Sequence, residues 1–574
     1  QLLKVDPEVF VTGDESGSDV VTELAESPLD QSTKSLANAH SVLQRISSDP
    51  KANIEVYKRV ADEVHAASAD EGSKVDMARV VHVDLHKEGA NPVLSRKTVD
   101  VIANELWSVR SLLVHQRDDL NQFATAFSSR FGDRAVPLLQ ALDDDYGVAF
   151  GSRSQVPQPL IDGFPFAKRS DRTAIIRPSD LMIMTKLERA LRMGDEEIVI
   201  DAHDLETLDN ENLDFPSSFA TMGIFHAESP QALAADQFTF EPTATHAPSG
   251  ARLLSRFCVG SSELQSRVRD QIEAFEGNHP DAIVAEFAHL PEGRVGNVVL
   301  RPVLREYELP YLGRSGAPEN KQIKLTDLFV SVRDGIVTLR SLSLGKEIIP
   351  RITTAHNYSN PTNLPLYQFM GALERQHEPA VGFSWPASVQ NLPYLPKVRS
   401  GRLLLSRQRW LVAPHELEQM LGVVEQDGAI RAVRDLIERL ALPVRVRSKR
   451  ADNFVDLDLD SERDAHLFIE EARRSRARGL KLEESFNDEQ SAVDAAGNAF
   501  KHEVVIPFFR RHPADIPSRR RAASRSRHLI TSPGHHTPGS RWIYAKLYAG
   551  TEAIDQVVAN IVPYIARSLA ELGW

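Results

Sequence analysis

The chain has 574 residues, which is too long for one hydrophobic core and predicts roughly three to four domain-sized units. It is 42% hydrophobic and 26% charged with a mean hydropathy of -0.29, and no stretch reaches the roughly 18 consecutive apolar residues of a membrane-spanning helix. The net charge of -13 argues against a uniformly basic nucleic-acid binder, but it leaves room for a local basic patch.

The only cysteine, Cys258, excludes an intramolecular disulfide framework and any cluster of thiolate ligands around a metal. No signal peptide is visible, so we expect a cytoplasmic protein without a membrane span. Because the chain opens on Gln1 and stops at Trp574, we expect it to be a fragment of something longer.

The first part of the chain is predicted to be largely helical. Apolar residues at three- and four-residue spacing follow an acidic, Ser- and Gly-rich linker at 13–31. These predicted helices cover 35–46, 53–67, 95–113 and 119–132. Ser95 is a suitable N-cap for the third helix, and the apolar run around Asp84 predicts a strand before it.

A long Pro- and Gly-rich connection at 145–180 separates this part from a region of predicted strands. Short β-branched runs occur at 282–290, 297–304, 328–342 and 401–412. Asp334-Gly335 predicts a hairpin turn inside the third run, and helical patterns return at 414–424 and 429–440. The order of elements predicts an α+β fold with mixed α/β parts in a large, irregular domain of several subdomains.

His82, Asp84 and His86 alternate along the predicted strand, so their side chains share one face. Three interpretations are open: a metal site, a charge-relay set, or a solvated strand face. The rest of the sequence offers no partner pair with ligand spacing, so the strand face is favoured over the metal.

Two further polar groups stand out. Arg256 lies in an apolar stretch, where its guanidinium must find either a neighbouring acid or an anionic ligand. Arg351, His356 and Asn357 gather in a Pro-bounded loop at 348–361, where bracing of the loop is favoured over lining a site.

The densest basic run, 508–528, holds seven arginines and one aspartate. It is either a solvated linker or a segment that tracks RNA phosphates. The arginines of this run that we consider for RNA contact are Arg510, Arg511, Arg519, Arg520 and Arg521. The sequence contains no G-x-S-x-G elbow, P-loop or dinucleotide-binding glycine motif.

Three segments together resemble the class I lanthipeptide (lantibiotic) dehydratases. Residues 285–369 resemble the family's "LPEgRvgN" strand pair, its "DL-vsv-dg" hairpin and its "PRltnAHNys" loop. Residues 395–410 match the next family segment, and 539–574 resemble the strand and helix that open the C-terminal domain. Their shared order along the chain makes the resemblance specific.

The resemblance implies a two-step dehydration. A large N-terminal domain would transfer glutamate from glutamyl-tRNA to Ser or Thr side chains of a precursor peptide, and a smaller domain would then eliminate glutamate to leave dehydroalanine or dehydrobutyrine. Neither step is expected to need a metal or a cofactor. Glutamyl-tRNA serves as the co-substrate of the first step. The implied partners are the leader and core of the precursor peptide, glutamyl-tRNA, a lanthionine cyclase and a second copy of the chain.

The resemblance also assigns residues. Asp84 and Arg256 match an aspartate and an arginine of the family's glutamylation site, where Asp84 would either orient the substrate ammonium or act as a base. Arg351, His356 and Asn357 are then candidates for substrate binding, and the arginines of 508–528 are candidates for tRNA binding.

The implied domains are a glutamylation domain at 1–505, a basic linker at 506–535 and the start of an elimination domain at 536–574. The family's N-terminal arginine cluster and the arginines and histidine of its elimination site are expected outside this chain. Two alternatives stay open: a tRNA-dependent peptide aminoacyl ligase that never eliminates, and a non-catalytic peptide-binding scaffold.

Overall fold

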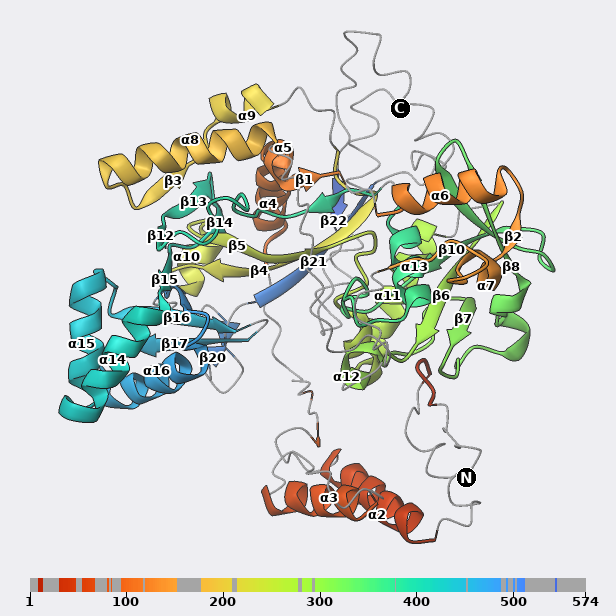
Figure 1. Ribbon diagram of the computed structural model, residues 1–574, viewed down its shortest axis with the longest axis horizontal. Helices are drawn as coiled ribbons and strands as arrows, with labels where there is room; N and C mark the ends of the chain where they lie inside the picture. The colour runs from red at the N-terminus through yellow and green to blue at the C-terminus, as the bar shows by residue number, and fades with distance from the viewer. Residues whose placement is uncertain are drawn as a thin grey trace.

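The computed structural model of the chain is shown in Figure 1. It describes residues 9–13, 30–47, 54–67, 80–81, 84, 94–116, 119–151, 177–208, 214–276, 281–291, 295–376, 378–450, 453–486, 492–493, 499–500, 503–510 and 542–544. Most of these residues belong to three sheets with attached helices, which confirms the predicted α+β fold.

A helical hairpin precedes the sheets and lies at the bottom of Figure 1. It consists of α2 (Asp30–Ser47) and α3 (Ile54–Ala67), as their apolar spacing predicts. Val80 and Val81 pack against its small apolar core. The strand that we predicted around Asp84 is wrong for the described residues: Val80 lies in a turn, and Val81 and Asp84 lie outside any strand, because the two valines contact the hairpin instead of a sheet.

The largest sheet has seven strands. In spatial order they are β22 (Trp542–Tyr544), β21 (Glu503–Arg510), β4 (Ser218–His226), β5 (Thr239–His246), β14 (Leu403–Ser406), β13 (Lys397–Ser400) and β3 (Glu197–Val199). Strand β21 pairs antiparallel with residues 218–224 of β4, so residues that are far apart in the chain share this sheet. The segment expected as a linker from residue 506 therefore begins inside a strand.

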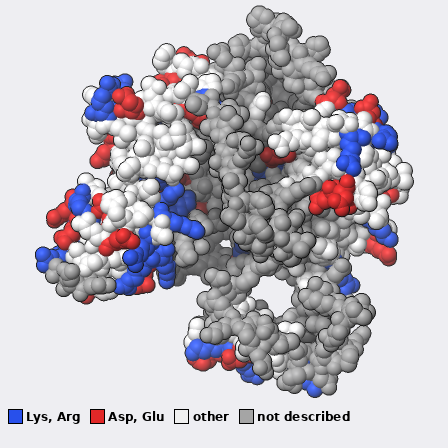
Figure 2. Space-filling model, viewed as in Figure 1, with Lys and Arg blue, Asp and Glu red and all other residues white. Residues whose placement is uncertain are grey.

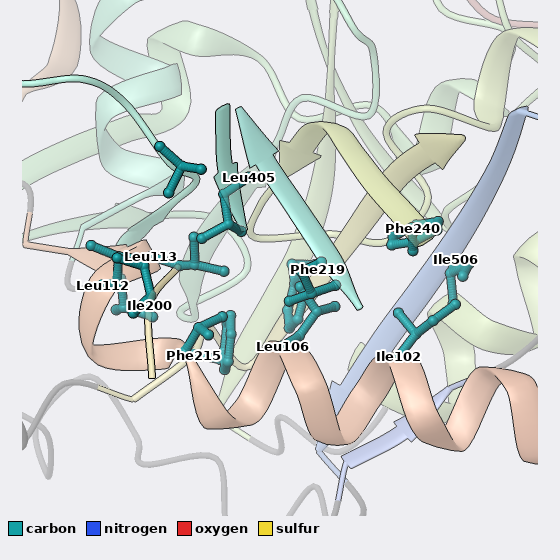
Figure 3. Close-up of a cluster of buried hydrophobic side chains, with 14 of the residues drawn as sticks. Ile102, Leu106, Leu112, Leu113, Ile200, Phe215, Phe219, Phe240, Leu405 and Ile506 are labelled. Carbon is teal, nitrogen blue, oxygen red and sulfur yellow. The ribbon is translucent and has the colours of Figure 1, made fainter. Parts of the chain in front are cut away.

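Helices α4 (Arg96–Ser108) and α8 (Pro178–Met193) contribute to the core of this sheet. The Ser95 hydroxyl accepts a hydrogen bond from the Thr98 amide at 3.0 Å, which confirms the predicted N-cap. Figure 3 shows α4 placing Ile102 and Leu106 beside Phe219 and Ile506 of the sheet. The predicted helix at 95–113 is divided, because α5 (Arg110–Leu113) starts anew after Val109.

The second sheet has six strands. Their order is β2 (Val136–Pro137), β8 (Leu328–Arg333), β9 (Ile336–Ser341), β10 (Glu347–Arg351), β6 (Ala282–His289) and β7 (Tyr307–Tyr311). The predicted Asp334-Gly335 turn is confirmed, with φ values of 53° and 76° that suit a tight hairpin between β8 and β9. Helices α6 (Asn121–Phe131) and α13 (Pro365–Glu374) supply apolar residues to the core of this sheet.

The strand predicted at 297–304 is wrong. Gly296–Val299 form the short helix α12, and Val299 is buried in a small cluster with Val11 and Ala288. The β preference of the valines is overridden by this packing and by Arg301, whose guanidinium is bound by the strand residue Glu286.

The third sheet has five strands, in the order β12 (Tyr394–Leu395), β15 (Arg409–Val412), β18 (Leu480–Glu484), β16 (Arg445–Arg450) and β17 (Asn453–Asp458). Its core is shared with α14 (Pro414–Asp427), α15 (Ala429–Leu440) and α16 (Glu462–Ser475), the first two as predicted. The predicted strand region 401–412 is divided between two sheets as β14 and β15. Arg407 lies at the division, and its guanidinium binds Glu241 Oε1 (2.6 Å) and the Glu484 carbonyl (2.8 Å).

Figure 2 shows Lys and Arg gathered over the lower-left body, which Figure 1 identifies as the five-stranded sheet and its helices. In this body, strand β16 carries Arg445 and Lys449, which are exposed, and Arg447, which is buried. Arg447 pairs with Asp456 at 2.8 Å and lies over the ring of Phe454. This acidic chain thus carries a locally basic surface, part of it neutralised by carboxylates.

Shorter elements complete the described fold. They are β1 (Val114–His115), β11 (Ala380–Val381), α7 (Leu138–Ala141), α9 (Ala202–Leu208), α10 (Pro230–Ala234), η3 (Ser255–Gly260), α11 (Ser262–Glu276), η4 (Glu319–Lys321), η5 (Leu325–Asp327), β19 (Ala492–Val493) and β20 (Ala499–Phe500). Among all helices described, none has the length and apolarity needed to cross a membrane.

Phe219 provides a test of the large core. Its ring lies 5.0 Å from both Phe215 and Phe508, and it thereby ties β21 to the rest of the sheet. We expect Phe219→Ala to lower the free energy of unfolding by about 3–5 kcal/mol, because it removes a buried ring and leaves a cavity. Urea unfolding followed by tryptophan fluorescence measures this. Leu342→Ala, at a side chain that is 71% exposed, is the control, and an equal effect of both substitutions would contradict the packing described.

Candidate active site

Arg256 and Asp84, which are 172 residues apart in the chain, meet in space. Nη2 of Arg256 donates to Oδ1 of Asp84 at 2.6 Å. The two side chains are 20% and 33% exposed, so the pair is neither sealed in the core nor fully in solvent. The guanidinium also lies 4.7 Å from the ring centroid of Phe257. Of the two partners that the sequence left open for Arg256, a neighbouring acid is therefore present, and the pair remains accessible to a further ligand.

Beneath this pair lies a buried network of arginines and glutamates. Glu286 on β6 binds Arg301 at 2.6 Å and also binds Arg305. Arg305 in turn binds Glu276 of α11 at 2.7 Å. Glu286 and Arg301 are 1% exposed at the side chain, and Arg305 is 2% exposed, so each charge depends on its partners.

The arginines keep the network ionised. Burial by itself raises the pKa of Glu286, but Arg301 and Arg305 outweigh burial and hold that pKa below its ordinary value. The same balance between burial and Arg305 lowers the pKa of Glu276. Burial lowers the pKa of the Arg305 guanidinium, and the two glutamates more than reverse this and raise it. The network is thus a set of compensated charges at neutral pH.

Hydrogen bonds connect the network to the turn that carries Arg256. Oγ of Ser255, the residue just before Arg256, donates to the Thr353 carbonyl at 2.6 Å. The Thr353 amide donates to Oε1 of Glu286 at 2.8 Å, and its hydroxyl donates to Oε2 at 2.7 Å. Arg252, one turn earlier, binds Glu374 at 2.7 Å. The short helix η3 is therefore anchored on its buried side, while Arg256 extends toward the surface.

Two histidines lie near Arg252. Burial, followed by the charges of Arg252 and Arg375, lowers the pKa of His246 to about 4. Burial and Arg252 also lower the pKa of His356, whose Nδ1 is 3.0 Å from the Tyr367 hydroxyl. Burial is the main cause of both lowered pKa values, because it disfavours the charged imidazolium, and the positive charge of Arg252 lowers both pKa values further.

The structure separates the loop residues that we predicted to bind substrate. Arg351 belongs to the buried network, where Nε binds Glu276 at 3.3 Å and Nη1 donates to the Glu374 carbonyl at 3.4 Å. Asn357 is exposed, and its Oδ1 accepts hydrogen bonds from the amide and hydroxyl of Ser359. Arg351 and Asn357 thus make the bracing contacts that the sequence favoured, and His356 is half-buried beside Tyr367.

Most of the other predicted site residues lie outside the part of the chain that the structure describes. Arg510 ends strand β21, and Arg511, Arg519, Arg520 and Arg521 lie outside the described residues. His82 and His86 lie outside them as well. In the ranges that the structure does describe, no three His, Cys, Asp or Glu side chains are grouped so as to hold a metal ion.

The residues that support Arg256 did not stand out in the sequence: Ser255, Glu276, Glu286, Arg301, Arg305 and Thr353. One signal was available, since Glu286 stands in the middle of the apolar run 282–290. A carboxylate at a buried strand position must be paired. The identity of its partners, however, depends on contacts between distant segments.

With this geometry established, comparisons identify the family. A family model described as "Lantibiotic dehydratase, N terminus" matches residues 1–468. The chain belongs to the lantibiotic dehydratase family.

Individual relatives of this chain are distant. The nisin biosynthesis protein NisB of Lactococcus lactis subsp. lactis is 21% identical over 324 residues, which cover 55% of this chain and 31% of NisB. The subtilin biosynthesis protein SpaB of Bacillus subtilis is 20% identical over 287 residues, covering 48% of this chain and 27% of SpaB. The chain thus spans less than a third of the length of either relative.

The crystal structure of the tRNA-dependent lantibiotic dehydratase MibB from Microbispora sp. 107891 resembles this chain with a TM-score of 0.64. The match is 20% identical and covers 87% of this chain and 48% of MibB. At this identity, the likeness shows a shared fold.

The network can be tested at Glu286. We expect Glu286→Gln to lower the free energy of unfolding by about 3–5 kcal/mol, because it leaves the buried Arg301 and Arg305 without their shared counter-charge. Glu470→Gln, which removes the charge from an ion pair whose members are 51% and 54% exposed, should change little. Urea unfolding measures the free energy of unfolding of both variants. Equal losses of stability for the two variants would contradict the dependence of the buried network on Glu286.

His246 predicts a pH dependence. Its folded pKa of about 4 lies below the ordinary value of 6.5, so the unfolded chain binds more protons between these values and stability falls as the pH drops through that range. We expect His246→Gln to reduce the slope of unfolding free energy against pH between 6.5 and 4. An unchanged slope in urea titrations at several pH values would contradict the burial of a neutral imidazole there.

Proposed function

We propose that this protein catalyses glutamyl-tRNA-dependent glutamylation of Ser and Thr side chains in a precursor peptide during lanthipeptide dehydration. Family membership supports this proposal. The observation that carries it is the Arg256–Asp84 pair, held at 2.6 Å on an anchored turn and still partly exposed.

The first step is an acyl transfer. The peptide hydroxyl oxygen bonds to the glutamyl carbonyl carbon, the bond from that carbon to the tRNA ribose oxygen breaks, and the hydroxyl proton ends on the released ribose oxygen. Arg256 would bind the negative charge of the glutamyl carboxylate or of the developing oxyanion, since a guanidinium offers several fixed donors. Asp84 would bind the substrate ammonium or accept the hydroxyl proton.

The second step removes the α-proton of the esterified residue and expels glutamate, leaving dehydroalanine or dehydrobutyrine. We assign this step to an elimination domain that starts within 536–574, after a glutamylation domain at 1–505 and a basic linker at 506–535. Residues 506–510 of that linker segment form the end of strand β21. A carboxylate departs readily where hydroxide does not, which gives the first step its chemical purpose.

Several partners follow from the proposal. The precursor peptide would bind through leader and core, with His356 and Asn357 as candidate contacts, and the arginines at 510–521 would contact tRNA phosphates. A lanthionine cyclase would act on the dehydrated product. We further propose a homodimer and a cytoplasmic location.

A mass-spectrometric assay tests the proposed function. The full-length protein containing this chain is incubated with its precursor peptide, glutamate, glutamyl-tRNA synthetase and tRNA. Loss of water at Ser or Thr is the expected result. Stable amino-acid adducts alone would indicate a ligase, and an unmodified peptide would indicate a scaffold; either outcome contradicts the proposal.

Arg256→Ala should lower glutamylation by about 100-fold or more while the protein stays folded, because it removes a charged donor from the reacting centre. Arg110→Ala is the matched control, since Arg110 also lies over an aromatic ring, that of Trp107 at 5.0 Å. Adduct yield and circular dichroism are measured for both variants. An unchanged yield with Arg256→Ala would contradict the assignment of this residue.

A further inference from the structure

The turn that carries Arg256 is fixed at two buried points. Arg252 is bound to Glu374 through its guanidinium, and the Ser255 hydroxyl is bound to the Thr353 carbonyl. Both Arg252 and Ser255 are almost fully buried. Beyond them, Phe257 is 37% exposed, so the chain emerges from the core within two residues of Ser255.

Thr353, whose carbonyl accepts the hydrogen bond from Ser255, is itself fixed by two hydrogen bonds to Glu286. Thr353 is 0% exposed, and both its amide and its hydroxyl donate to the carboxylate of Glu286. That carboxylate is oriented by Arg301 and Arg305. The Thr353 carbonyl is therefore a rigid reference point of the buried network.

The backbone position of Arg256 limits where its guanidinium can reach. Consecutive Cα atoms are about 3.8 Å apart, so fixing Ser255 restricts where the Arg256 side chain begins. A side chain with several rotatable bonds loses less freedom in a productive contact when its backbone is already placed. The hydrogen bond from Ser255 supplies this placement.

We infer that Ser255 is a positioning residue for glutamyl transfer, with its hydroxyl holding Arg256 in register with Asp84 through the Thr353 carbonyl. The inference rests on the proposed function. Ser255 contacts neither substrate nor reacting atoms in this account, and it acts through Arg256.

Ser255→Ala and Ser400→Ala form a matched pair. Ser400 is 5% exposed, and its hydroxyl donates to the Ile200 carbonyl at 3.0 Å in the seven-stranded sheet, so each substitution removes one buried serine–carbonyl hydrogen bond. We expect similar losses of stability, because the same kind of bond is lost. Only Ser255→Ala should lower kcat/KM for glutamylation, by about 10–100-fold, since a displacement of about 1 Å in a reacting group can cost that much.

The Arg256→Lys background separates positioning from general damage. If Ser255 acts through Arg256, adding Ser255→Ala to Arg256→Lys should lower kcat/KM little further. A second pair covers the case in which Ser255→Ala does not fold: Thr353→Val, which loses the hydroxyl bound to Glu286, should lower kcat/KM, and Thr353→Ser should retain it.

The outcomes distinguish the positioning role of Ser255 from the proposed glutamylation activity. An active wild-type protein whose kcat/KM is unchanged by Ser255→Ala, or lowered equally by Ser400→Ala, overturns the positioning role alone. A multiplicative loss in the Arg256→Lys background overturns it as well. A wild-type protein that forms no glutamyl adducts overturns the proposed function and this inference with it.

Discussion

The burial of one carboxylate, Glu286, is the constraint on which the site depends. It stands on a strand flanked by neighbours on both sides, with its side chain 1% exposed. An ionised group there is tolerated only if charge and hydrogen bonds replace water. Arg301 follows α12, Arg305 precedes β7, and Thr353 follows β10. One buried charge thereby connects three segments that lie outside the helices and strands of this sheet.

Such a network specifies a structure more than it stabilises it. Buried ion pairs lose hydration on both sides, so their net contribution to stability is small even though removal of one member is costly. The network holds the Thr353 carbonyl in place, and this carbonyl anchors the short helix η3, which carries Arg256. Arg407 repeats the principle where two sheets adjoin, since its buried guanidinium binds Glu241 of β5 and the end of β18. Burial raises the pKa of Glu241, but His226 and Arg407 outweigh it and bring the pKa to about 2.

Local features of the fold were predictable from the sequence. Ser95 caps its helix and Asp334-Gly335 turns its hairpin, because these residue types act on their immediate neighbours. The same reasoning failed where distant contacts decide: the valines at 80–81 pack on a helical hairpin, and Val298 and Val299 enter a helical turn. Asp84 and Arg256 were singled out by resemblance to a family, and their contact is a tertiary property. The role of Ser255 could not be predicted from its residue type, because it depends on a hydrogen bond to the distant Thr353.

We propose that Asp84 and Arg256 act as one unit in glutamyl transfer. A double-mutant cycle with Asp84→Asn and Arg256→Lys, measured as single-turnover rates of glutamyl transfer by the full-length protein, tests it most directly. If the two residues act together, the double variant should be about as slow as the slower single variant. Rate losses that multiply in the double variant would show that the two side chains act independently, and would contradict the account.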